Sequence, residues 1–354
     1  MFKRFALIAG LVSALSLPSA PAPKAAGKEF KVCWTIYAGW MPWGYLSETG
    51  IMKKWADKYG ITVEIVPVND YIECINQYTA GQFVAATSTI MDAISIPAAG
   101  GVETTALISG DYSNGNDGIV LKGKESLADI KGQKVNIVEF SVSHYFLARA
   151  LETVGLSEKD ITIVNTSDAD MIAAFPTPEV TAMVTWNPQL ATVAAMSDAH
   201  EVFDSSKLPG EIVDALIVNT AALKETPELG KALIGAWFEM QALMVADTAE
   251  SKAAKEAMAA ASGTDLAGFQ AQLDKTKLFV TPADMVAFVS DPKMKETQDF
   301  MRKFLFDKGL LGQGATSPDA IGVSFPDGSV LGDPANVKLH IDAEFAKMAA
   351  EGKL

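Results

Sequence analysis

Short apolar runs alternate with helically spaced apolar positions along residues 31–110. Runs rich in β-branched and aromatic residues predict strands, and the segments between them repeat apolar residues at helical spacing. The predicted strands cover 31–37, 61–66, 83–86 and 104–109. The predicted helices between them cover 46–58, 71–80 and 87–94. Strands and helices that alternate with short connections predict an α/β lobe with a largely parallel sheet.

A second α/β series follows a polar, glycine-rich loop at 110–118, and the pattern after residue 219 is mainly helical, with an irregular segment at 310–337. The chain is therefore expected to leave one lobe, build another and return through a two-strand hinge. We assign residues 27–118 and 219–354 to lobe 1 and residues 119–218 to lobe 2. Clefts between lobes are favoured ligand sites, and such lobes commonly close around a ligand.

The first residues have a different pattern. Lys3 and Arg4 precede an apolar run at 5–17, and small residues and prolines follow at 18–26. This is the three-part layout of a secretory signal peptide, so we predict that residues 1–26 are cleaved and that the protein is exported to the periplasm. A buried first helix is the alternative. No later segment has the long uncharged apolar run that a membrane-spanning helix needs.

Composition narrows the class of partner. The chain has 354 residues, 49% of them hydrophobic, and a formal net charge of −14. This acidity argues against nucleic acid or an anionic membrane surface as a partner. Cys33 and Cys74 could form a disulfide in an exported protein, or could be two separately buried thiols. The spacing of the histidines and cysteines indicates no metal site, and we expect no cofactor.

Several motifs resemble a known family. The segment 135–156 (VNIVEFSVSHYFLARALETVGL) is similar to the second-lobe strand, serine turn and helix of the nitrate/sulfonate/taurine-type receptors. These are type-II periplasmic substrate-binding proteins of bacterial ABC importers. The segments 39–44, 97–102, 110–117 and 165–171 resemble, more narrowly, the subgroup encoded beside urea carboxylase genes, for which urea and guanidine are the candidate ligands. The resemblance implies a monomer that delivers a small ligand to an ABC permease.

The residues at the predicted strand ends indicate the charge of that ligand. These loops carry acids and aromatic rings, including Tyr71 and Tyr112, but no Lys or Arg. A guanidinium ion donates paired hydrogen bonds to a carboxylate and stacks on an aromatic face. Neutral urea could use the same rings, but its carbonyl would need donors such as Ser88, Ser141 or Asn187. The pattern therefore favours a small planar cation.

We predict Glu139, at the end of a second-lobe strand, as the charge partner of the cation, with Asp92 opposite it. Trp40 and Trp186 are expected to line the pocket, whereas Tyr37 and Trp43 suit pocket and core equally. Capping is the alternative role of Ser141, and a structural contact in the first helical turn is the alternative for His144. The full predicted set is Tyr37, Trp40, Trp43, Ser88, Asp92, Asp117, Glu139, Ser141, His144, Trp186 and Asn187.

Two other functions stay open at this point. An alkanesulfonate, taurine or nitrate receptor could hold its anion with helix N-termini in place of arginine. An exported hydrolase is the alternative of another class, but the sequence contains no nucleophile elbow, Cys–His constellation or phosphate loop. We therefore expect a receptor and not an enzyme.

Overall fold

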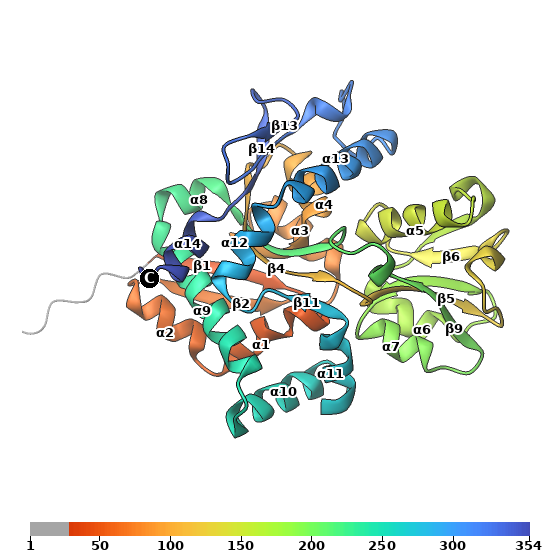
Figure 1. Cartoon of the computed structure of the whole chain (residues 1–354), viewed down its shortest axis with the longest axis horizontal. Coiled ribbons are helices and arrows are strands. Elements are labelled where there is room, and N and C mark those ends of the chain that lie inside the picture. Colours follow the sequence, from red (N-terminus) through yellow and green to blue (C-terminus); the bar gives the residue numbers. More distant parts are fainter. Residues whose placement is uncertain (1–27) are drawn as a thin grey trace, which may run out of the picture.

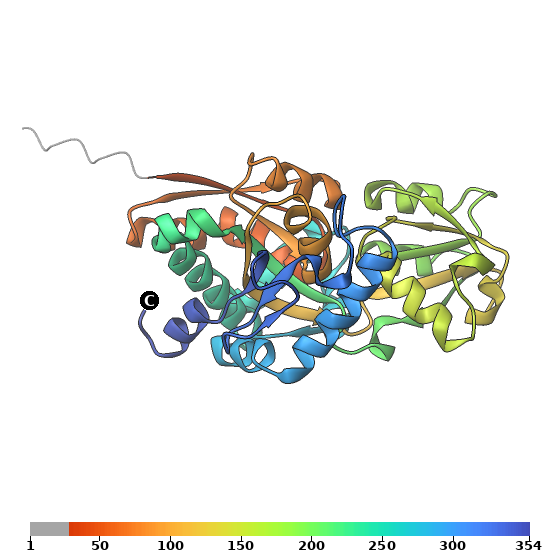
Figure 2. The ribbon, with the colours of Figure 1, turned by 90° about the horizontal axis from the view of Figure 1, so that it is seen from above.

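The computed structural model describes residues 28–354, so the predicted signal peptide lies outside the described residues. Two α/β lobes lie next to each other along the long axis of the molecule (Figure 1). The larger lobe contains both ends of the described chain, and the smaller lobe is built from its middle part. The view from above shows the same division (Figure 2). No helix among these residues combines the length and apolar character needed to cross a membrane.

The large lobe is built on a mixed sheet of nine strands in the described part of the chain. Its order is β13-β12-β14-β4-β10-β3-β1-β2, with β11 paired to β4. The strands are β1 (Glu29–Trp34), β2 (Thr62–Pro67), β3 (Ala85–Thr89), β4 (Thr104–Ser113), β10 (Val213–Asn219), β11 (Thr276–Leu278), β12 (Gly322–Ser324), β13 (Val330–Leu331) and β14 (Val337–Ile341).

Helices from both chain segments surround this sheet (Figure 1). The first segment contributes α1 (Met41–Glu48), α2 (Ile51–Lys58), α3 (Tyr71–Thr79) and α4 (Ile90–Ala93). The second contributes α8 (Thr220–Glu225), α9 (Pro227–Val245), α10 (Ala249–Ala261), α11 (Leu266–Asp274), α12 (Pro282–Val289), α13 (Pro292–Asp307) and α14 (Glu344–Ala350).

The small lobe has a five-stranded sheet of order β7-β6-β8-β5-β9 within the described residues. The strands are β5 (Asp117–Lys122), β6 (Lys134–Ile137), β7 (Thr162–Asn165), β8 (Ala182–Trp186) and β9 (Ala199–Asp204). The helices are α5 (Val142–Thr153), α6 (Met171–Ala174) and α7 (Gln189–Ala194). Parallel pairing of β6 with β7 and β8 puts the carboxyl ends of β6 and β8 at one edge, which faces the large lobe.

The crossings between the lobes differ in detail from the sequence prediction. β5 enters the small sheet at Asp117, close to the predicted start of lobe 2 at residue 119. β10, which the prediction put at the end of lobe 2, pairs antiparallel with β3 and β4 in the large sheet. The return crossing therefore comes before Val213. An apolar strand fits either sheet by its pattern alone, and the pairing of its backbone decides between them.

Three predicted elements changed for identifiable reasons. The predicted helix at 46–58 is two helices, because Gly50 adopts a left-handed φ of +80° between them. The segment 310–337, predicted as irregular, contains β12 and β13 and ends at the start of β14, which pairs parallel with β4. β4 itself continues to Ser113 through the predicted loop, where β10 and β11 pair with it. Pairing with distant strands overrode the local polar and glycine-rich signal.

Two tryptophans pack in the large-lobe core and fix the end of β4. Trp43 stacks on Trp237 with ring centroids 4.9 Å apart, and both side chains are about 1% exposed. A Cβ at Gly110 would lie 2.9 Å from Cζ2 of Trp237. Only glycine lets β4 pass this ring, and Asp111 follows directly. Trp43 is therefore a core residue and not part of the predicted pocket.

Cys33 and Cys74 form a disulfide that joins β1 to α3 across 41 residues. Of the two alternatives that the sequence left open, the structure has the bridge. Both residues are fully buried. The bond constrains the helix that carries Tyr71 relative to the first strand of the sheet.

Removing this bridge should destabilise the protein. A Cys33→Ala, Cys74→Ala double variant is expected to lose about 2–4 kcal/mol of unfolding free energy, because the unfolded chain regains loop entropy. Denaturant unfolding of the oxidised parent, the reduced parent and the variant provides the measurement. Equal stability of the oxidised and reduced parent would contradict this role for the bridge.

A candidate cation site between the lobes

A small cavity lies where the two lobes meet. Its volume is about 20 Å³, and since a single water needs roughly 10–15 Å³, this is room for one or two water-sized groups. The large lobe contributes most of the wall, and Asp117, Val142 and Trp186 come from the small lobe. The lining residues are Tyr37, Trp40, Tyr71, Thr89, Asp117, Val142, Trp186, Ile212 and Asp214.

Aromatic rings form a continuous wall of this cavity. Trp40 stacks on Tyr71 at a centroid distance of 5.8 Å and an interplanar angle of 29°. Tyr37 meets Trp40 edge-on at 5.1 Å, and Trp186 meets Tyr71 edge-on at 5.6 Å. The Trp186 indole also donates to the carbonyl of Ile36 at 3.3 Å, so a small-lobe ring is bonded to the large lobe. Rings in such a wall can present their negative faces to a cation.

Local backbone geometry brings the first two rings to this position. Tyr37 is extended, and a short 3₁₀ helix, Ala38–Trp40, follows it directly. A Cβ at Gly39 would lie 2.6 Å from Oδ2 of Asp111 and 2.6 Å from Cε1 of Tyr37. Glycine is therefore required for the turn to approach the carboxyl group of Asp111 so closely.

Carboxyl groups form the polar side of the site. Asp117 and Asp214 line the cavity and are each 4% exposed. Asp111 lies behind Asp214, fully buried, and accepts a hydrogen bond of 2.9 Å from the Tyr37 hydroxyl. Burial raises the pKa of Asp117 to about 7 and also raises the pKa values of Asp111 and Asp214. Buried carboxyl groups resist ionisation unless a positive charge or enough donors compensate them.

Asp92 connects the lobes next to the cavity. Its Oδ2 accepts hydrogen bonds from the Tyr71 hydroxyl at 2.7 Å, the Thr89 hydroxyl at 2.9 Å and the backbone N–H of Val142 at 3.2 Å. Val142 is the first residue of α5, in the small lobe. Burial raises the pKa of Asp92 to about 6. Asp92 thus holds a wall ring and the opposite lobe together.

No group of three or more His, Cys, Asp or Glu residues within 28–354 is arranged to hold a metal ion. Among the same residues, none that lines the cavity is Lys, Arg or His. The site is therefore acidic and aromatic, with no basic group in its wall.

A family model described as NMT1/THI5 like matches residues 49–251 of this chain, more than half of its length. The chain belongs to the NMT1/THI5-like family. A protein of Brucella abortus (strain 2308), named as a candidate binding protein, is 24% identical to this family member over 214 residues. The match covers 58% of this chain and 61% of the relative, so the chain spans about three fifths of the length of the curated relatives it matches.

Solved structures share the fold of this NMT1/THI5-like protein. The alkanesulfonate-binding protein SsuA from Xanthomonas axonopodis pv. citri, bound to MOPS, superposes with a TM-score of 0.66 at 16% identity, covering 81% of this chain and 95% of that one. The periplasmic nitrate-binding protein NrtA from Synechocystis PCC 6803 superposes with a TM-score of 0.58 at 14% identity, covering 93% and 99%. The predicted periplasmic-binding-protein fold, with two α/β lobes, is confirmed.

The structure brings part of the predicted residue set together. Tyr37, Trp40, Asp117 and Trp186 line the cavity. Asp92 contacts wall residues without lining it. Each of these residues lies at or near a strand end, where the sequence pattern indicated a ligand edge.

Ser141 and Asn187 have structural partners beside the cavity. Ser141 caps α5, accepting from the Ser143 N–H at 3.2 Å and donating to the Val138 carbonyl at 2.7 Å. This is the capping role named as its alternative. The Asn187 side chain donates to Asn116 at 2.7 Å, and its carbonyl accepts from the Ala38 N–H at 3.2 Å. Asn187 therefore links the lobes through the backbone.

The remaining predicted residues have other surroundings. The Ser88 hydroxyl donates to the Thr89 carbonyl at 2.9 Å. His144 pairs with Glu158 and accepts from the Phe140 N–H at 3.1 Å. Glu139 is half-buried, and its side chain is not part of the cavity wall. Trp43, as described above, packs in the core. Position at a strand end could not predict in which direction the Glu139 side chain extends.

Sequence reasoning missed Asp214, Thr89, Val142 and Ile212, and noted Tyr71 without selecting it. Asp214 is the informative case. It is a charged residue in the otherwise apolar run Val213–Val218, and such a residue in a buried strand needs a special environment. This signal was present in the sequence but was not used.

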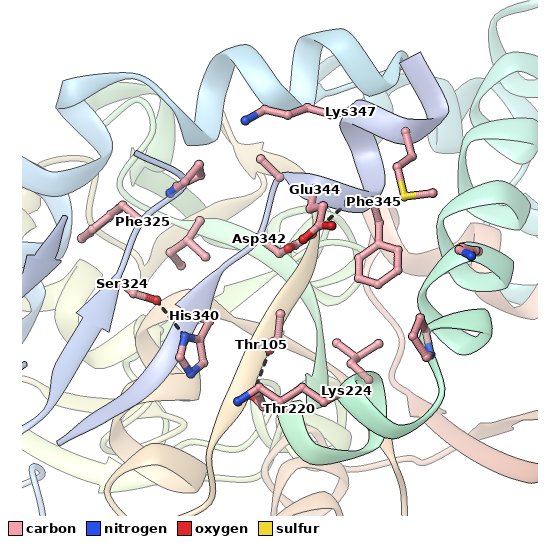
Figure 3. A pocket seen from close by; sticks show the side chains of 17 residues that line it. Thr105, Thr220, Lys224, Ser324, Phe325, His340, Asp342, Glu344, Phe345 and Lys347 are labelled. Carbon is pink, nitrogen blue, oxygen red and sulfur yellow. Dashed lines mark hydrogen bonds between the residues drawn. The ribbon is translucent and has the colours of Figure 1, made fainter. Parts of the chain in front are cut away.

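A larger hollow of about 750 Å³ lies on the large lobe, where α8 and α9 meet β14 and α14 (Figure 3). Lys224 and His340 lie in its wall, and both bond to Glu103, at 3.1 Å and 2.9 Å. Its wall mixes lysines with Asp342 and Glu344. These mixed charges do not select one class of ligand, and we locate the candidate site between the lobes.

The buried carboxyl groups predict how stability depends on pH. Their folded-state pKa values are raised above the ordinary value of 3.8, so the folded protein binds more protons than the unfolded chain up to about pH 7. The unfolding free energy of the ligand-free protein should therefore fall as the pH rises through 6 and 7. Asp168 and Asp342, with pKa values of about 6, contribute in the same direction.

Asp117→Asn should reduce this loss of stability between about pH 5 and about pH 8 by on the order of 2 kcal/mol. Denaturant unfolding across this pH range is the measurement. Asp129→Asn, at an exposed position, is the control and should leave the pH dependence unchanged. An equal slope in the parent and Asp117→Asn would contradict the raised pKa.

Proposed function

We propose that this protein is an extracytoplasmic solute receptor that binds guanidinium, a small planar nitrogen cation, in the interlobe cavity. The observation that carries the proposal is the lining itself. Aromatic rings and the carboxyl groups of Asp117 and Asp214 meet there, and no Lys, Arg or His of residues 28–354 is part of the wall. Family membership and the two-lobed fold support solute binding as the general function.

Guanidinium can interact with both the aromatic rings and the carboxyl groups of this wall. Its flat, weakly hydrated face stacks on aromatic rings such as Trp40 and Tyr71. Its N–H groups form charge-assisted hydrogen bonds with carboxylates. Oδ2 of Asp214 is buried without a hydrogen-bond partner among the described residues. A cation would also compensate charges that burial otherwise opposes.

An anionic ligand fits this wall poorly. The similar structures named above bind an alkanesulfonate or nitrate. For this chain, the corresponding hypothesis is that helix N-termini bind the anion in place of arginine. The first N–H of α5, that of Val142, already donates to the Asp92 carboxyl group. A sulfonate or nitrate in this cavity would also face Asp117 and Asp214. Charge repulsion in a buried site therefore disfavours both anions wherever these carboxyl groups are ionised, which for Asp117 is above about pH 7.

Neutral urea is the second small planar candidate. Its carbonyl needs donors, and the side chains considered for this task donate elsewhere. Ser88 donates to Thr89, Ser141 to Val138 and Asn187 to Asn116. The rings would still stack on urea, but the carboxyl groups would gain no compensating charge. We therefore favour guanidinium over urea.

The proposal includes the cellular context. The predicted signal peptide at 1–26 would direct export, and a monomeric receptor would deliver its ligand to an ABC permease in the inner membrane. The same proposal includes membership of the subgroup encoded beside urea carboxylase genes and a ligand of the kind expected for that subgroup. The hydrolase alternative has no supporting constellation in the cavity, where the lining offers rings and carboxyl groups.

Guanidinium binding is directly testable. Calorimetry at about pH 8 with millimolar guanidinium chloride should give saturable heat, whereas urea, taurine and nitrate should give weak heat or none. Melting temperature should rise with guanidinium, since a ligand at 100 times its Kd adds about 2.7 kcal/mol to the unfolding free energy. Sodium chloride at equal ionic strength is the control. Taurine or nitrate heat without guanidinium heat would overturn the proposal.

A matched pair of variants tests the location of the site. Asp214→Asn should weaken guanidinium binding by about 30-fold or more, because loss of one partner of a buried charge pair costs about 2–5 kcal/mol. Glu139→Gln removes a carboxylate outside the cavity wall and should change the affinity by less than about threefold. Calorimetry of both variants decides the matter. The reverse ranking would favour Glu139, the charge partner expected from the sequence.

A further inference from the structure

We propose that Asp111 and Asp214 share one proton in the ligand-free protein and that guanidinium binding releases this proton to solvent. The carboxyl pair would thus exchange a proton for the cation. This inference deepens the proposed function and rests on it for the identity of the cation. The shared proton itself is a property of the protein without ligand.

Sheet geometry brings the two carboxyl groups together. Asp111 on β4 is the register partner of Asp214 on β10, and the two strands are antiparallel neighbours. Residues directly opposite each other on one sheet have Cβ atoms about 5 Å apart. Burial and the neighbouring charge of Asp111 both raise the pKa of Asp214. Asp111 is 0% exposed and Asp214 is 4% exposed, so bulk water has almost no access to the two carboxyl groups.

The hydrogen bonding of the two carboxyl groups is incomplete unless they share a proton. Oδ2 of Asp111 and Oδ2 of Asp214 are both buried without a hydrogen-bond donor in the part of the chain that the structure describes. Tyr37 satisfies Oδ1 of Asp111 and leaves Oδ2 free. A proton between the carboxyl groups turns one of them into the missing donor. Two carboxylates this close and this buried do not both ionise without it.

The surroundings reinforce the need for a proton. The titratable groups that act on the pair are Tyr37, from the turn after β1, and Asp117, from β5, and both are acids. On the other side of β4, the β11 residue paired with Asp111 is the apolar Leu278. No Lys, Arg or His of residues 28–354 forms an ion pair with Asp111, Asp117 or Asp214 within 4.0 Å. A cation in the cavity would supply the positive charge that these elements lack.

The exchange is balanced and has a defined consequence. Guanidinium enters the cavity with one positive charge, the O–H bond of the pair breaks, and one proton leaves for bulk water. The total charge of the site is the same before and after. Affinity must then rise with pH, by up to about tenfold per pH unit for the release of one proton. Asp117 is mainly ionised above its pKa of about 7, so the remaining slope between about pH 8 and about pH 9 reports on the pair.

Calorimetry with guanidinium chloride tests the exchange. In the parent, Kd should fall about five- to tenfold between about pH 8 and about pH 9. Titrations in buffers of different ionisation enthalpy should show release of most of one proton per ligand. Asp111→Asn keeps a donor beside Asp214 but cannot release a proton, so its Kd should be nearly independent of pH in this range. Glu139→Gln, outside the cavity wall, is the control and should keep the slope of the parent.

A measurement without ligand separates this proposal from the proposed function. Infrared spectra of the full chain at about pH 8 should contain the carbonyl band of a buried protonated carboxyl group, absent in Asp111→Asn. Guanidinium binding with no such band and no pH slope would overturn the shared proton and leave the receptor function intact. The band without any guanidinium binding would overturn the function and leave the shared proton. An equal slope in Asp111→Asn and the parent would overturn the exchange.

Discussion

Burial of carboxyl groups between two lobes, against aromatic rings, is the constraint on which the rest of this structure depends. Asp92, Asp111, Asp117 and Asp214 are each at most 4% exposed. Taking a carboxylate out of water costs several kcal/mol unless a positive charge or several donors replace the water. Asp92 has donors from both lobes, whereas the cavity carboxyl groups have few. A site of this kind is unfavourable by itself and becomes favourable with a proton or a bound cation.

Sheet topology creates this concentration of acids. β4 leads out of the large lobe and β10 leads back into it, and the two strands pair antiparallel. Asp111 and Asp214 therefore meet at the crossing, although about a hundred positions separate them in the sequence. Asp117 begins β5 just after the first crossing. The hinge of the fold and the charged part of the site are thus the same segments of chain.

Direct contacts between the lobes surround the cavity. Trp186 bonds to Ile36, and the Val142 N–H bonds to Asp92. Farther out, Lys308 on the large lobe pairs with Glu158 on the small lobe. The wall rings and the acids belong to both lobes, so the site is complete only when these contacts form. In the proposed receptor, ligand affinity and lobe closure would therefore be linked through the same groups.

The sequence by itself determined the two α/β series, the strand ends that carry Trp40 and Trp186, and the acidic and aromatic character of the ligand edge. These features are local, since periodicity and turn residues act over a few positions. Tertiary structure alone decided that Asp214 and not Glu139 lines the cavity, that Asp111 lies behind it and that Cys33 bonds to Cys74. The reason is physical: side-chain direction and strand register depend on pairing between distant segments, which no local pattern specifies.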